Sequence, residues 1–172
     1  MKRLALIGGG HAHLHILKSL ASHSWSGVEV VLISPYARQL YSGMVPGWIA
    51  GHYSLDQCAA TLQPLVDRAG ARFIKDSVTS MDAQRRVIHG DIAGDIDYDV
   101  LSLDIGALVD SSCLAATGAA LLPIRPLENF VVGWNRQLEQ FRQQGKARLV
   151  VVGGGLPVSN LRWPLGIGYS MN

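Results

Sequence analysis

The chain has 172 residues, which is enough for about one domain with a sizeable core. Apolar residues make up 48% of the chain and charged residues 16%, which excludes a disordered tail and a solvated helical rod. Fifteen basic against thirteen acidic residues leave a formal charge of +2, too little for the basic footprint of a nucleic-acid-binding protein.

The cysteine content and the hydropathy exclude further classes of protein. Cys58 and Cys113 lie far apart and outside any CxxC or Cys/His spacing, so we expect two ordinary buried thiols rather than a redox pair, a zinc site or a disulfide framework. The first apolar run stops at glycines and histidines, too soon for a signal peptide, and no run approaches the ~18 residues of a membrane span. We therefore expect a cytoplasmic protein, with peripheral membrane association left open.

The beginning of the chain has the pattern of a βαβ unit. Residues 3–7 (RLALI) form an apolar run that ends at the glycine triplet 8–10. Within residues 11–21 the apolar positions recur at helical spacing, at Leu14, Leu17, Leu20 and Ala21. Residues 28–33 (VEVVLI) are typical of a buried strand. This order predicts two parallel strands joined by a right-handed helical crossover.

The middle of the chain alternates irregular and regular segments. Residues 36–53 are rich in glycine and aromatic residues and are expected to be irregular, whereas residues 55–69 are expected to form a helix that ends at Gly70. Short strands are expected over residues 71–74, 77–80, 86–89 and 98–103, with turns at Gly90 and Gly94.

The end of the chain departs from this order. An amphipathic helix over residues 130–144 and a strand over 148–152 (RLVVV) lead into a second glycine triplet, 153–155, which should open another phosphate-binding helix. Residues 156–172 instead contain two prolines and have no helical periodicity. Back-translation with one G restored turns their start into AAGVELALAL, a helix-forming continuation of G-x-G-x-x-G. We hypothesise that this tail is out of frame on a truncated reading frame, which resequencing the gene tests.

The first glycine triplet is typical of a phosphate-binding turn. Gly8 permits a tight turn, and Gly10 lets a diphosphate approach the backbone amides and the dipole of the following helix. His13 replaces the third glycine of the G-x-G-x-x-G fingerprint, and Ser34 stands where an acidic residue would hold the ribose. Glu29 lies too early in its strand for that role. The motif alone is therefore a weakened dinucleotide signature, and a glycine-rich turn without a ligand is the alternative.

Four segments carry a more specific resemblance: GGGHAH (8–13), SPYARQLYSGMVPGWIAGHYS (34–54), YDVLSLDIG (98–106) and RPLENF (125–130). Together they resemble the FAD-dependent pyridine nucleotide-disulfide oxidoreductase superfamily. More narrowly, they resemble the type II NADH dehydrogenase-like modules associated with selenide, water dikinase. The resemblance covers residues 3–155 and implies an α/β, Rossmann-like FAD/NAD(P)-binding three-layer fold with a small β-rich portion, here incomplete. It also implies oxidation of NAD(P)H through FAD, with a quinone-like electron acceptor.

The resemblance further implies which residues contact the cofactor. Those around the FAD diphosphate are Gly8, Gly10, His11 and Ala12. Those near the adenosine ribose are Ser34, Pro35 and Arg38. Those near the flavin ring are Tyr41, Ser42, Gly43, Met44 and Pro46. Val78 would contact the adenine through its backbone. Asp104 and Gly106 belong to an Asp-Ile-Gly turn that closes over the cofactor, where the family usually has Ala-Thr-Gly.

Several of these residues have other interpretations. His11 and His15 lie one helical turn apart and could chelate a metal, but no further ligand supports this, and no metal site is expected. Asp97 and Asp99 are predicted to be solvated turn carboxylates. Asp104 differs because it interrupts an apolar strand end, which predicts a functional contact. Aromatic side chains of the irregular segment could stack on a flavin or simply pack, namely Tyr41, Trp48 and Tyr53.

The expected organisation has three parts. Residues 1–147 form an incomplete FAD-binding domain, residues 148–155 begin a second dinucleotide-binding domain, and residues 156–172 form the aberrant tail. We expect such a fragment to lack turnover by itself and to expose core surface. No acid–base catalyst is expected, because a flavin performs the hydride chemistry itself. A non-catalytic FAD- or NAD-binding module and an inactive pseudogene product remain the alternatives.

Overall fold

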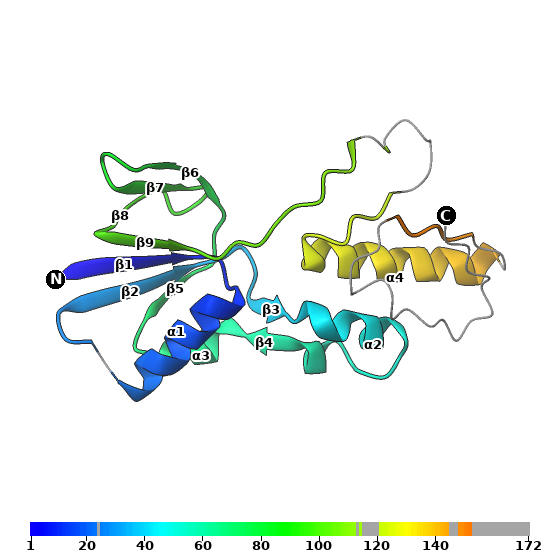
Figure 1. Cartoon of the computed structure of the whole chain (residues 1–172), viewed down its shortest axis with the longest axis horizontal. Helices are drawn as coiled ribbons and strands as arrows, with labels where there is room; N and C mark the ends of the chain where they lie inside the picture. Colours follow the sequence, from blue (N-terminus) through cyan, green and yellow to red (C-terminus); the bar gives the residue numbers. More distant parts are fainter. Residues whose placement is uncertain (24, 113, 115–120, 145–147, 153–172) are drawn as a thin grey trace. The chain divides into compact units, whose positions relative to one another are not determined.

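The computed structural model describes residues 1–23, 25–112, 114, 121–144 and 148–152 (Figure 1). The chain divides into two compact units, the first made of residues 1–39 and 60–106 and the second of residues 40–59 and 107–172. Within the described ranges, no helix is both long enough and apolar enough to cross a membrane. Cys113, the second glycine triplet and the tail over 156–172 lie outside the described residues.

A four-stranded parallel sheet is the centre of the first unit, in the order β5-β2-β1-β9. Its strands are β1 (Lys2–Ile7), β2 (Val28–Ile33), β5 (Arg72–Ile74) and β9 (Val100–Leu103). Helix α1 (His11–Ser22) joins β1 to β2, and these strands pair in parallel from Lys2 opposite Val28 to Ile7 opposite Ile33. The predicted βαβ unit is confirmed.

The two faces of this sheet are covered by different layers. Leu6 and Leu32 pack with Leu17 of α1 and with Leu62 of α3 (Leu62–Arg68). On the other face, Ala5, Ile7, Val31 and Ile33 pack with Ile88 and Ile96 of a small antiparallel sheet. That sheet has the order β6-β7-β8, made of β6 (Val78–Asp82), β7 (Val87–Gly90) and β8 (Asp95–Asp97). Figure 1 shows α1 and α3 on one side of the parallel sheet and β6–β8 on the other, so the predicted three-layer α/β fold is confirmed.

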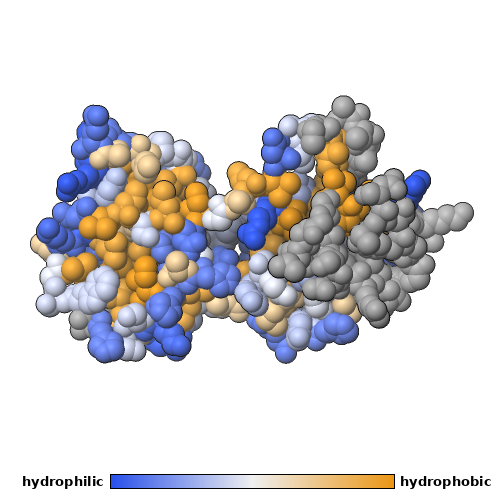
Figure 2. Space-filling model, in the orientation of Figure 1, coloured by the Kyte–Doolittle hydropathy of each residue, from blue (hydrophilic) through white to orange (hydrophobic). Residues whose placement is uncertain are grey.

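Strand β9 lies at one edge of the parallel sheet and keeps part of its apolar surface exposed. Val100 and Leu103 on this strand and Ile105 just after it are more than half exposed to solvent. Figure 2 shows further apolar surface on the face of the first unit that is in view. The expectation that a fragment exposes core surface stays a prediction.

The helix expected over residues 55–69 is wrong in its first half. The structure has a 3₁₀ turn over Asp56–Cys58, strand β4 (Ala59–Thr61) paired with β3 (Arg38–Leu40), and only then α3. Pro64 explains the late start, because proline lacks an amide hydrogen and is tolerated only in the first turn of a helix. Strand β8 was not expected, since aspartate is rare in strands; its pairing with β7 and the burial of Ile96 outweigh that preference.

In the second unit, a 3₁₀ turn over Ser42–Met44 leads into α2 (Val45–Ile49), and α4 spans Leu127–Gln144. Helix α4 was expected from residue 130. Its buried Phe130 and Trp134, stacked with ring centroids 6.1 Å apart, pack with Val45 of α2. The strand expected over residues 148–152 is wrong. None of the sheets in the described part of the chain offers this segment a partner strand, and Leu149 packs against the α2–α4 cluster instead.

Candidate functional site

The glycine turn lies at the carboxyl end of β1, between the ends of β2 and β9. The amide of Gly8 donates a hydrogen bond of 2.8 Å to the carbonyl of Ile33 at the end of β2. Gly8 has a φ of +92°, and a Cβ atom there would collide with the carbonyl of Asp104. Glycine is therefore required at this position both by the left-handed backbone and by the close approach of the chain after β9.

The side chain of Asp104 fills the space beside Gly10. Its carboxylate Oδ2 accepts hydrogen bonds from the amides of Ala12, at 2.8 Å, and of His13, at 3.3 Å. A Cβ atom on Gly10 would overlap the carboxylate, so this glycine provides the space that the anion occupies. The first amides of α1 have no partner within the helix, and the helix dipole favours negative charge beside them. The amides expected to face a diphosphate thus bind a carboxylate of the same chain.

His13, the residue in place of the third glycine, is a buried bridge. Its side chain is fully buried, with Nδ1 at 2.7 Å from the Gly8 carbonyl and Nε2 at 2.9 Å from the Ser102 hydroxyl on β9. A carbonyl oxygen only accepts hydrogen bonds, so Nδ1 carries a proton and donates it to Gly8. The imidazole therefore ties α1 to the turn and to β9, a role that the sequence analysis missed. The signal in the sequence for its partner was Ser102, a polar residue within the otherwise apolar strand β9.

The end of β2 carries a hydroxyl group and no acidic side chain. Ser34 is buried, its Oγ accepts a hydrogen bond of 3.3 Å from the Tyr36 amide, and its carbonyl accepts one of 3.1 Å from the Asp76 amide. These contacts fix the chain where it leaves the sheet. That Ser34 lies near a ribose stays a prediction.

Asp76 is a buried carboxylate that sequence reasoning overlooked. It accepts hydrogen bonds from the amides of Ala93 and Ser77, both at 2.8 Å, and of Ile92 at 3.1 Å. The Ala93 amide, followed by those of Ile92 and Ser77, lowers the pKa of the carboxyl group against the opposing effect of burial. Asp76 follows a short strand, and no local sequence pattern distinguishes it, because its hydrogen-bond partners lie up to seventeen residues away.

The other residues expected near the cofactor in the first unit are placed as follows. His11 and Ala12 are exposed at the start of α1, and Pro35 is exposed directly after Ser34. Arg38 is half-buried at the start of β3, and Val78 is half-buried at the start of β6, packed against the core. Gly106 is exposed, with a φ of +73°. The contacts described above bring together Gly8, Gly10, Ala12 and Asp104.

The segment expected near the flavin ring belongs to the second unit. Tyr41 is half exposed, and its ring lies against Gly43, where a Cβ atom would stand 3.0 Å from the ring. Ser42, Gly43 and Met44 form the 3₁₀ turn, closed by a hydrogen bond from the Met44 amide to the Tyr41 carbonyl. Tyr53 lies against Gly47 in the same way, and Trp48 packs beside Val45. The aromatic rings therefore have packing partners within their own unit.

Cys58, also in the second unit, is a buried thiol, as expected. Only 1% of its surface is exposed, and burial raises the pKa of the thiol. Its Sγ lies 3.9 Å from the carbonyl of Met44. A thiol in this environment is a packing residue rather than a nucleophile.

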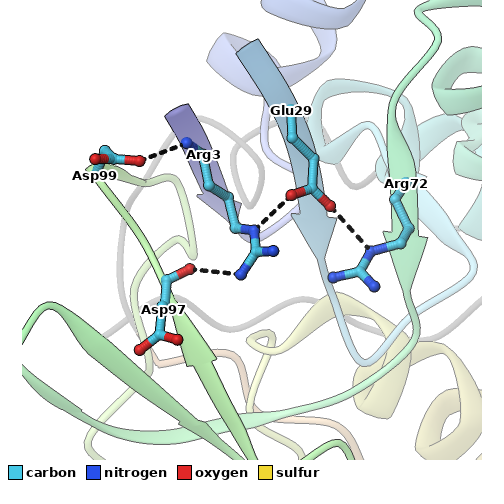
Figure 3. Close-up of polar contacts among 5 residues, drawn as sticks. All are labelled: Arg3, Glu29, Arg72, Asp97 and Asp99. Carbon is cyan, nitrogen blue, oxygen red and sulfur yellow. Dashed lines mark hydrogen bonds and ion pairs between the residues drawn. The ribbon is translucent and has the colours of Figure 1, made fainter. Parts of the chain in front are cut away.

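Glu29, near the amino end of β2, forms ion pairs with Arg3 and Arg72, and Arg3 makes further hydrogen bonds to Asp97 and Asp99 (Figure 3). Glu29 accepts a hydrogen bond of 2.7 Å from Arg3 and lies 3.8 Å from the guanidinium of Arg72. The amide of Arg3 donates to the carboxylate of Asp99 at 2.7 Å, and its guanidinium donates to the carbonyl of Asp97 at 3.1 Å. Asp99 is exposed at a bend directly before β9, as predicted for a solvated turn carboxylate, whereas Asp97 is exposed but lies in β8 rather than in a turn. Glu29 thus links β2 to β1 and β5 at the end of the sheet opposite to the glycine turn.

His11 and His15 are exposed on α1, and among the described residues no group of three His, Cys, Asp or Glu side chains could hold a metal ion.

Comparison by sequence finds no family model and no curated protein that matches the chain. Comparison by structure finds oxidoreductases. NDH2 of Plasmodium falciparum, solved in complex with NADH, has a TM-score of 0.67 and 14% identity over 87% of this chain and 31% of its own. Sulfide:quinone oxidoreductase of Aquifex aeolicus has a TM-score of 0.63 and 17% identity over 83% of this chain and 33% of its own. NADH:rubredoxin oxidoreductase of Clostridium acetobutylicum has a TM-score of 0.62 and 15% identity over 92% of this chain and 40% of its own.

These likenesses define the class of fold. The chain shares the Rossmann-like three-layer fold with these three solved structures, and this fold is the one that the sequence resemblance implied. It spans between 31% and 40% of the length of these three structures.

Proposed function

We propose that the first unit binds a dinucleotide, FAD, by its diphosphate at the turn Gly8–Ala12. The observation that carries this proposal is the anion already bound there: the Asp104 carboxylate lies in the space left by Gly10 and accepts hydrogen bonds from the first amides of α1. A helix start that binds one anion through backbone amides has the chemistry needed to bind another.

Most residues of the turn fit a diphosphate group. The gap at Gly10, the amides of α1 and the hydroxyl of Ser34 at the end of the neighbouring strand match the needs of a diphosphate and a ribose. Arg38 adds a guanidinium that can pair with phosphate oxygens. Asp104 is the exception, because its carboxylate takes the place that a phosphate would need. FAD therefore fits this turn only when that side chain is elsewhere.

We propose further that this chain acts in a flavin-dependent NAD(P)H oxidoreductase that passes electrons to a quinone-like acceptor. The names of the structural neighbours support this, since they include an NADH complex and a quinone oxidoreductase. When bound, FAD supplies the chemistry of hydride acceptance and electron release. The residues of this chain bind and orient the cofactor, and none is proposed as an acid or a base. In this proposal residues 1–147 belong to the FAD-binding part and residues 148–155 begin a part that binds the nicotinamide nucleotide.

Titration of the purified chain with FAD tests the binding proposal. We expect flavin absorbance to stay with the protein through gel filtration, and calorimetry to show one site. Gly10→Ala is the matched variant, because its added methyl group fills the gap in which the anion lies; it should remain folded by circular dichroism yet lose FAD. Folded wild-type protein that takes up no FAD contradicts the proposal.

A second function is a nucleotide-binding module without turnover. The observation that favours it is the same anion-binding turn at the start of α1, which is sufficient for binding a nucleotide without a second dinucleotide-binding part. Consumption of NADH in the presence of FAD and a quinone distinguishes the two: turnover identifies the enzyme, and FAD binding without turnover identifies the module.

A further inference from the structure

Asp104 places a negative charge where the proposed ligand must place its own. Its Oδ2 lies 2.8 Å from the amide of Ala12, and the whole carboxyl group overlaps the position of a Cβ atom on Gly10. Helix α1 has no side-chain cap of its own at Gly10, and its first turn contains no acidic residue. The carboxylate that complements the helix dipole thus comes from the residue directly after β9, more than ninety residues later in the chain.

The same amides cannot serve this carboxylate and a phosphate together. Two anions in one small space repel each other, and each amide hydrogen has one strong acceptor position to fill. The backbone of Asp104 is held in place, because its amide donates to the Ile7 carbonyl at 2.8 Å and its carbonyl accepts from the Gly10 amide at 3.3 Å. The residues after it, Ile105 and Gly106, are exposed. A rotation of the side chain toward solvent is therefore enough to release the amides, without any movement of the sheet.

We infer that Asp104 is an internal competitor of the ligand: its carboxylate holds the diphosphate position in the free protein and weakens the binding of any diphosphate compound. The inference rests on the proposed function for the identity of the natural ligand, FAD. It does not need FAD for its test, since inorganic pyrophosphate probes the same amides. Asp104 thus stabilises the empty turn and at the same time raises the ligand concentration at which the turn becomes occupied.

The test compares wild-type protein with Asp104→Ala by calorimetry, using inorganic pyrophosphate and FAD as separate probes. Removing the carboxylate should strengthen pyrophosphate binding on the order of tenfold, because the amides and the gap at Gly10 become available. In the same variant, the midpoint of thermal unfolding of the unliganded protein should fall, because α1 loses its cap. If Asp104 had only a structural role, the variant would lose both thermal stability and pyrophosphate affinity. A gain in pyrophosphate affinity together with a lower unfolding midpoint therefore identifies competition.

Asp97→Asn is the matched control. It removes one carboxylate from the same unit, and Figure 3 shows that Asp97 contacts Arg3 through its backbone carbonyl rather than its carboxylate. Its affinity for pyrophosphate should equal that of the wild type. A gain in this control as large as in Asp104→Ala would mean that net charge alone is responsible and would overturn the inference.

Asp104→Asn covers the case in which the alanine variant does not fold. It keeps an oxygen that can accept from Ala12 but removes the charge, so pyrophosphate binding should still strengthen, by less than in Asp104→Ala. Pyrophosphate binding that is unchanged or weaker in the folded variants overturns the inference, even if wild-type protein binds FAD. Stronger pyrophosphate binding with no FAD binding in any variant supports the inference and rejects the proposed function.

Discussion

The carboxylate of Asp104 and the amide of Ala12 are joined by a hydrogen bond of 2.8 Å between residues 92 positions apart. This contact links the end of β9 to the start of α1 across the glycine turn. The two ends of the contact are complementary: α1 supplies amides that have no partner within the helix, and Asp104, directly after β9, supplies an anion. The turn is therefore a closed structure in the free protein, rather than an open cradle.

Gly8→Ala should destabilise the first unit by about 2 kcal/mol or more, because alanine at positive φ is strained and its methyl group meets the Asp104 carbonyl. Gly27→Ala is the matched control, since Gly27 has a φ of +75° with nothing within 4 Å of an added Cβ. It should cost only about 1 kcal/mol. Urea unfolding measures both. Equal losses would show that backbone strain, and not the close approach of β9, sets the requirement for glycine.

His13→Ala should lower the free energy of unfolding by about 3 kcal/mol, because it leaves a cavity and a buried carbonyl without its donor. Ser102→Ala should cost about 1 kcal/mol, since it removes only one hydrogen bond. The double variant measures the coupling between them. Losses that simply add would mean that the imidazole and the hydroxyl do not act as a pair.

Asp76 should make the folded state sensitive to acid. The amides of Ala93, Ile92 and Ser77 hold the pKa of its carboxyl group below the ordinary range, so its contribution is complete above that range and is lost as the pH falls through the lowered value. The stability difference between wild type and Asp76→Asn should therefore shrink as the pH drops below about 4. Unfolding in urea over an acidic pH series measures it.

Asp91→Asn, an exposed residue beside the same turn, is the control for the loss of one surface carboxylate. It should leave the pH dependence close to that of the wild type. A stability difference between wild type and Asp76→Asn that stays constant with pH would mean that the pKa of the Asp76 carboxyl group is the same in the folded and the unfolded chain.

Glu29→Gln should cost about 1 kcal/mol or less, because the Arg3–Glu29 pair is half-buried and partly screened by solvent. The loss should become smaller at high salt, and FAD affinity should not change, since the pair lies at the amino ends of the strands (Figure 3). Arg72→Gln is the control, with a longer contact of 3.8 Å and a more exposed side chain, and should cost less. A loss of FAD binding in Glu29→Gln would instead place this residue in the site.

Patterns that repeat over a few residues were predicted well. The strand–turn–helix–strand unit and helix α4 follow from apolar spacing that one stretch of chain contains, and the glycine turn follows from the backbone needs of its own residues. Predictions failed where a neighbour decides the outcome. Residues 148–152 have the composition of a strand but form none, because they have no partner strand in the described part of the chain. Strand β8 contains two aspartates, which are unfavourable in strands, but it forms because it pairs with β7.

The sequence by itself determined that this chain builds a parallel α/β core with a phosphate-type turn after its first strand, because those features depend on local periodicity and on glycine. Only the tertiary structure decided what occupies that turn. Asp104, His13 and Asp76 act through partners up to 92 residues away, and no local pattern encodes such pairs. The pairing of β9 with β1 brings Asp104 to the amides at the start of α1 and thereby places a charge in the turn.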